Sequence, residues 1–247
     1  MRYLIFSDIH SNLEALEAML AWSKRKRIDK YVMLGDLVGY AASPNQVVSL
    51  VRKLRPLEII RGNHDKVAAG VESGEDFNAA ALRAATWTNG KLTKPNLGFL
   101  RDLSRGPRTV DGRFVICHGT PFDEDAYMFS EYDAMQAFAS FDGEICFFGH
   151  THIPRIYVQN GSGGIGFAPI LGDESRIELQ NGYRYLINPG SVGQPRDRNP
   201  KISFAVFDGD RRTLTVYRRP YSIERAQFKI ERAALPQVLS ARLSVGV

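Results

Sequence analysis

Cysteine is scarce in this chain of 247 residues, which contains only Cys117 and Cys146. Each lies inside a short apolar run typical of a buried strand, so we expect two core residues in a reducing compartment. Two thiols in such positions indicate neither a disulfide nor a zinc knuckle.

Long hydrophobic stretches are missing as well. The first apolar run stops at Ser7 and Asp8, so we expect no signal peptide, and no later run is long enough to span a bilayer. These absences predict a cytoplasmic protein without a membrane partner. Apolar residues make up 44% of the chain and charged residues 24%, as in soluble proteins with a substantial core.

The sequence also lacks the pattern typical of a surface that binds single-stranded nucleic acid. The net charge of +5 favours an anionic partner only weakly, and basic residues do not alternate with aromatic ones in any segment. Residues 161–166 match G-x-G-x-x-G, but Pro169 and Gly172 interrupt the segment where a dinucleotide fold needs a helix. We therefore expect a flexible loop there, and a nuclease is only an alternative.

Histidine is rare too, and all five copies lie in short polar motifs that follow apolar runs. Runs this short, rich in β-branched and aromatic residues, predict buried strands. Open α/β sheets place their sites at the carboxyl ends of such strands, so one shared site is expected. The motifs are Ser7-Asp8-Ile9-His10, Gly35-Asp36, Gly62-Asn63-His64-Asp65, His118-Gly119 and Gly149-His150-Thr151-His152.

The remaining pattern predicts a single domain over residues 1–247 with two facing sheets and helices outside. Strands alternate with helices at the start, whereas strands predominate later. Asn181-Gly182 indicates a hairpin over residues 176–187. Three additions to the domain are expected: a helical insertion at 72–106, a Gly-rich insertion at 160–180 and a helical tail at 222–247.

The motif side chains suit a pair of metal ions. They offer imidazole, carboxylate and amide donors without a thiolate, which favours manganese, iron or zinc. Two divalent ions, two carboxylates and one hydroxide leave a charge of roughly +1, which attracts a phosphate oxygen. The reaction class this favours is in-line hydrolysis at phosphorus. The candidate ligands are Asp8, His10, Asp36, Asn63, His118, His150 and His152.

His64 is interpreted differently. It adjoins Asn63, and Asp65 could hold the tautomer of its ring, so we predict that His64 is the general acid and Asp65 its catalytic partner. The alternative for Asp65 is a cap on the following helix.

In order and spacing, the motifs resemble the calcineurin-like metallophosphoesterase superfamily, specifically its prokaryotic phosphodiesterase branch, whose pattern is D-x-H, G-D, G-N-H-[DE], H-G and G-H-x-H. The match extends to Gly39-Tyr40, Ala85-x-Trp87-Thr88 and residues 188–197. The Gly-rich stretch from Asn160 to Gln180 is the main departure, and it bears on substrate size because it follows His152.

The resemblance implies a four-layer α/β–β/α sandwich and a phosphodiesterase or phosphatase acting on a small or nucleotide phosphoester. It also implies two divalent ions, manganese first, with iron, zinc or nickel as alternatives, and it places the general acid on His64. Metal one would take Asp8, His10, Asp36 and His152, and metal two Asp36, Asn63, His118 and His150.

Five neighbours of the motifs are candidates for substrate binding, and for each arginine a salt-bridged surface position is the alternative. A non-catalytic scaffold is the alternative function, which the intact ligand set argues against. The substrate, the choice between monoester and diester, and the oligomeric state stay open. The substrate-binding candidates are Asn12, Tyr40, Arg61, Ser191 and Arg196.

Overall fold

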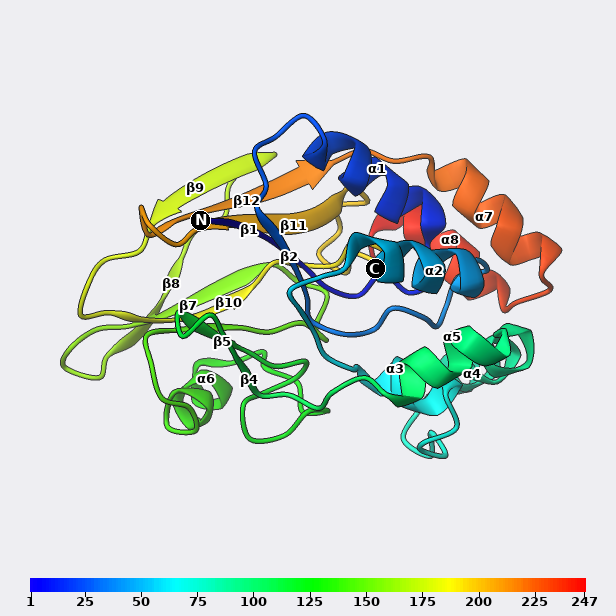
Figure 1. Ribbon diagram of the computed structural model, residues 1–247, viewed down its shortest axis with the longest axis horizontal. Coiled ribbons are helices and arrows are strands. Elements are labelled where there is room, and N and C mark those ends of the chain that lie inside the picture. The colour runs from blue at the N-terminus through cyan, green and yellow to red at the C-terminus, as the bar shows by residue number, and fades with distance from the viewer.

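Two six-stranded mixed sheets face each other in the computed structural model, which describes all 247 residues (Figure 1). The first sheet has the order β3 (Glu58–Ile59), β2 (Lys30–Met33), β1 (Arg2–Phe6), β11 (Ile202–Asp208), β12 (Thr213–Arg219) and β9 (Glu174–Glu178). The second has the order β4 (Arg108–Val110), β5 (Phe114–Ile116), β6 (Ile145–Phe147), β10 (Arg184–Asn188), β7 (Arg155–Gln159) and β8 (Ile165–Ala168).

Alternation along the strands builds the layers, because successive side chains leave opposite faces of a sheet. In β1, Tyr3 and Ile5 pack against the second sheet, whereas Leu4 and Phe6 pack against helices on the outer face. The second sheet is covered by α6 alone. The predicted four-layer sandwich is confirmed. Its helices are α1 (Leu13–Ser23), α2 (Pro44–Leu54), α3 (Asn63–Ala68), α4 (Ala79–Lys91), α5 (Lys94–Arg101), α6 (Glu131–Phe138), α7 (Ile223–Arg232) and α8 (Gln237–Val245).

The core of each sheet is parallel, and this determines where a site can form. β1, β2 and β3 run parallel in one sheet, and β5, β6 and β10 run parallel in the other. Parallel strands end at a common edge, so the loops that follow them meet there. Helices α3, α4 and α5 pack together beside this edge (Figure 1).

The hairpin expected at Asn181-Gly182 is wrong. β9 pairs with β12, whereas β10 pairs with β6 and β7, so the turn links two different sheets. The Gly-rich stretch at 160–180 contributes a strand to the edge of each sheet. The tail at 222–247 forms α7 and α8, which pack against each other, with α7 also against α1. No helix here, the longest having 13 residues, has the length and apolar character needed to cross a bilayer.

Candidate metal centre

The loops after five strands bring the candidate ligands to one place between the two sheets. Asp8 and His10 follow β1, Asp36 follows β2, and Asn63 begins α3 after β3. His118 follows β5, and His150 and His152 follow β6. All except Asn63 are buried.

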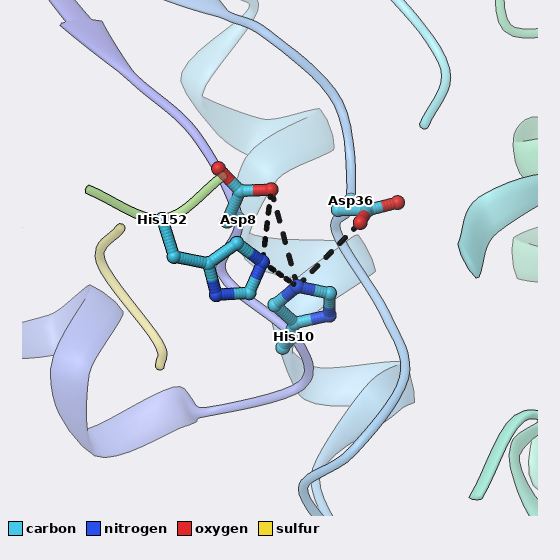
Figure 2. A group of neighbouring side chains, drawn as sticks. All are labelled: Asp8, His10, Asp36 and His152. Carbon is cyan, nitrogen blue, oxygen red and sulfur yellow. Dashed lines mark hydrogen bonds and ion pairs between the residues drawn. The ribbon is translucent and has the colours of Figure 1, made fainter. Parts of the chain in front are cut away.

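Four of these side chains form a first cluster (Figure 2). His10 Nε2 lies 3.0 Å from His152 Nε2 and 3.5 Å from Asp36 Oδ2. Asp8 Oδ1 lies 3.5 Å from His152 Nε2. The potential ligand atoms of Asp8, His10, Asp36 and His152 all lie within 4.8 Å of one another, which is close enough to surround one ion.

A second cluster shares Asp36 with the first. Asp36 Oδ2 lies 3.4 Å from His118 Nε2, and Asn63 Oδ1 lies 3.3 Å from the same nitrogen. The His150 ring lies 4.9 Å from the His118 ring, measured between centroids. One carboxylate oxygen therefore lies between two groups of donors, as in a dinuclear centre.

Backbone carbonyls set the orientation of three imidazoles. A carbonyl can only accept, so Nδ1 is the protonated nitrogen of each ring in its neutral form. Nδ1–H of His10 donates to Val38 O at 3.0 Å. Nδ1–H of His118 donates to Leu34 O at 2.8 Å, and that of His152 donates to Gln194 O at 2.6 Å. Every Nε2 lone pair then points into the centre, the arrangement that metal-binding histidines require.

These lone pairs face one another. His10 Nε2 and His152 Nε2 are both acceptors 3.0 Å apart, and both carboxylate oxygens of Asp8 are buried without a hydrogen-bond partner. Asp36 Oδ2 and His150 Nε2 are unpartnered as well. Buried acceptors aimed at each other are costly unless a cation lies between them, so the residues present fit a pair of divalent ions.

The pKa values reflect this concentration of buried donors. Burial raises the pKa of Asp8 to about 7 and lowers the pKa of His150 to about 3. Burial would lower the pKa of His118 too, but the charge and hydrogen bond of Asp36, together with Asp8 and the Leu34 carbonyl, raise that pKa to about 10. In the metal-free protein a proton on His118 thus partly compensates the Asp36 charge.

The backbone at the ligands is strained. Asp8, His10, Asp36, His150 and His152 all have φ between 49° and 65°, the left-handed region that non-glycine residues rarely adopt. Such conformations cost about 1–3 kcal/mol each and persist where the surroundings enforce them, commonly at functional sites. Five such residues in one centre indicate a fold organised around this cluster.

Asp65 does not hold the His64 ring, so its predicted catalytic role is wrong. Its carboxylate accepts hydrogen bonds from the backbone N–H groups of Asp36, Leu37, Val38 and Gly62, at 2.9–3.2 Å. Asp65 caps α3 through Gly62 N, as the alternative predicted, and it also fixes the loop that carries Asp36.

His64 lies beside both clusters without belonging to either. Its ring packs against His10, Tyr40 and Phe77, with centroids 4.3–4.8 Å apart. Gly39 makes room for it: φ at Gly39 is +99°, and a Cβ there would lie 2.5 Å from His64 Nδ1. Nδ1 is buried without a partner, so Nε2 is the nitrogen left to face the adjoining cleft.

Three of the five substrate-binding candidates have structural roles instead. Asn12 caps α1 through Ala15 N and donates to Gly193 O. Ser191 Oγ donates to Asp8 O. Arg61 is held by Glu124 through two hydrogen bonds at 2.8 and 3.1 Å, the salt-bridged alternative. Asn12 and Ser191 are engaged in these contacts, and Glu124 neutralises the charge of Arg61.

Tyr40 and Arg196 remain beside the centre. Tyr40 stacks at a tilt on His10, with centroids 4.5 Å apart, and Arg196 Nη2 donates to the Tyr40 hydroxyl at 3.1 Å. Arg196 Nε is buried without a partner. Burial lowers the pKa of His152 most, and the positive charge of Arg196 lowers it further because it opposes protonation of the ring.

A cleft of about 450 Å³ opens onto the second cluster. Asn63, His64 and His150 form its inner wall, and the loop between α3 and α4 forms much of its outer wall. No residue of the Gly-rich stretch lines it, so the expected effect of that stretch on the mouth of the site is wrong.

Sequence reasoning missed Lys66, which lies one turn from the ligands on α3. This buried ammonium pairs with Glu72 at 2.9 Å, Glu124 at 3.3 Å and Asp125 at 2.5 Å. The acidic side chains belong to the two loops that flank the cleft. The only available signal was the unusual lysine beside the G-N-H-D motif, because its partners are distant in sequence.

Fold and ligand geometry together define a metallophosphoesterase. Residues 1–212 match the calcineurin-like phosphoesterase superfamily domain, so the chain belongs to that superfamily.

An uncharacterized protein of Methanocaldococcus jannaschii is 38% identical over 244 residues, which cover 98% of this chain and 97% of that protein. A metallophosphoesterase from Sphaerobacter thermophilus is 39% identical, with a TM-score of 0.87, and the alignment covers 100% of this chain and 99% of that one. A hypothetical protein from Pyrococcus horikoshii shares the fold at 19% identity, with a TM-score of 0.79 and coverage of 100% and 98%.

Proposed function

We propose that this chain is a dinuclear-metal phosphoesterase that hydrolyses small phosphodiesters or phosphomonoesters, with His64 as general acid. The observation that supports it most strongly is the pair of donor clusters that share Asp36 Oδ2. Asp8, His10 and His152 would hold the first ion together with Asp36, and Asn63, His118 and His150 the second. When bound, a manganese pair, or iron, zinc or nickel in its place, supplies Lewis acidity and an activated water.

The residues around the clusters would position the phosphate. Arg196 provides a permanent positive charge beside the centre, and its hydrogen bonds to Tyr40 and Gln194 Oε1 fix the guanidinium plane. Tyr40 is buried between His10 and His64, so it also limits where an ester can lie. The cleft leads directly to this point.

His64 would deliver the proton to the leaving oxygen. Burial lowers its pKa to about 4, so its ring is neutral at pH 7 before substrate binds. A phosphate anion at Nε2 favours the protonated ring, because an opposite charge raises the pKa of an imidazole. His64 would therefore acquire its proton together with the substrate and release it as the ester bond breaks.

Chelation and reconstitution test the proposal. Turnover of bis(4-nitrophenyl) phosphate and 4-nitrophenyl phosphate should vanish after exhaustive treatment with EDTA and return with Mn²⁺. Asp36→Asn should abolish the Mn²⁺ response, since it removes the shared charge. Lys53→Met, at an exposed position of α2 without an ion pair, should behave as wild type. Activity that survives complete metal removal would contradict the proposal.

A further inference from the structure

The cleft beside the metal ligands has aromatic residues on two segments far apart in the sequence. Phe77, in the loop between α3 and α4, contacts the His64 ring with centroids 4.5 Å apart. Tyr127, between β5 and α6, stacks on the His150 ring at 4.0 Å and 24°. Both line the cavity, so an ester whose phosphate lies between His64 and His150 places its organic group against Phe77 and Tyr127.

The Tyr127 side is an exposed ring stack. Phe129 stacks on Tyr127 with centroids 5.3 Å apart and an angle of 11°. Tyr127 remains 47% exposed and Phe129 54% exposed, although both are large apolar side chains. Stacking on two neighbouring rings restricts how Tyr127 can turn, so the exposed part of its ring offers a flat group a contact surface at little entropic cost.

The cleft wall also carries four acidic residues. Glu75 and Asp76 line the cavity and are exposed, and neither has a cationic partner. The other two acidic residues of the lining, Glu72 and Asp125, are paired with Lys66. A second anionic group on the substrate would therefore meet uncompensated negative charge at the outer end of the cleft.

We infer that this site selects phosphoesters whose organic group is a flat aromatic ring without further negative charge. The inference rests on the proposed function and names its substrate class. It excludes sugar phosphates, which lack a flat ring, and polyphosphates, which carry a second anion. The net charge of +5 gives no hint of this selectivity, because the charge around the cleft has the opposite sign.

Competition of three monoesters with 4-nitrophenyl phosphate for the manganese-loaded protein, measured as inhibition constants from initial rates, tests the inference. Phenyl phosphate should bind about tenfold more tightly than methyl phosphate, in line with one ring contact. A carboxylate on the ring, in 4-carboxyphenyl phosphate, should weaken binding about threefold through repulsion. The double variant Glu75→Gln and Asp76→Asn should remove that difference.

Tyr127→Leu should reduce the preference for the phenyl ester over methyl phosphate to less than about threefold. Tyr132→Leu is the matched control, because Tyr132 is 62% exposed on α6 and does not line the cleft. If methyl phosphate binds and the phenyl ester binds no better, or Tyr127→Leu keeps the preference, the inference is overturned. If no phosphate binds and no ester is hydrolysed, the proposed function fails first.

Discussion

Lys66→Met removes the charge that connects α3 to both loops beside the cleft. Methionine preserves most of the apolar stem, so the variant removes the ammonium while leaving the packing nearly intact. The structure predicts what each acidic partner then does. Glu124 keeps its two hydrogen bonds from Arg61, whereas Glu72 and Asp125 are nearly half exposed and can turn to water.

The expected cost follows from this difference. Removing one partner of a fully buried ion pair costs about 3–5 kcal/mol because a charge is left unpaired. Each acidic partner keeps either other hydrogen bonds or contact with water, so we expect a loss of only about 2 kcal/mol, the net value of two charge-assisted hydrogen bonds and one ion pair, two of the three carboxylates being nearly half exposed. With a urea m value of about 3 kcal/mol/M, the midpoint should fall by about 0.7 M.

Urea unfolding at a fixed metal concentration measures this shift. Lys66→Arg should recover part of it because it restores the charge, and Lys53→Met, on the exposed face of α2, should leave the midpoint unchanged. An unchanged midpoint for Lys66→Met would refute the argument that this cluster connects the loops to α3. A changed m value would mean that the variant alters the extent of unfolding instead.

Three further perturbations have defined outcomes. His64→Gln should lower turnover of alkyl esters by about 10²–10⁴-fold, and turnover of 4-nitrophenyl esters much less, because their leaving group needs no proton. The metal content should stay unchanged, and loss of a metal ion would refute the assignment of His64 as the acid. Asp65→Ala should lower the free energy of unfolding by about 3 kcal/mol in urea, since it leaves buried N–H groups unpaired; a wild-type midpoint would contradict this. Because the pKa of His118 is raised to about 10 in the metal-free protein, Mn²⁺ binding at pH 7.5 should release a proton, and the affinity for Mn²⁺ should fall as the pH falls. Calorimetry in buffers of different ionisation enthalpy measures this release. Finding no released proton would contradict the assignment.

The sequence predicted the fold and the gathering of the ligands because both depend on chemistry that is local to each motif. Every ligand follows a short strand, and parallel strands of one sheet end at one edge. His10 follows β1 in the first sheet and His152 follows β6 in the second, and the two sheets face each other, so residues far apart in the chain bring their Nε2 atoms to 3.0 Å.

The incorrect expectations concern residues whose hydrogen-bond, ion-pair or strand partners are distant in sequence. Asp65 adjoins His64, yet its carboxylate reaches back to the loop of Asp36. Arg61 follows a strand as the ligands do, but Glu124, which neutralises it, lies 63 residues further along. Asn181-Gly182 forms a turn as predicted, but β9 pairs with β12 in the first sheet, whereas β10 lies in the second sheet. Which strand β9 pairs with depends on long-range packing, which turn residues do not determine.

An anomalous difference map at the manganese edge, from a crystal grown with Mn²⁺, tests the central claim most directly. Two peaks per chain should lie about 3.5–4 Å apart, one on each side of Asp36 Oδ2. A single peak, or two peaks of which neither contacts Asp36, would contradict a shared dinuclear centre.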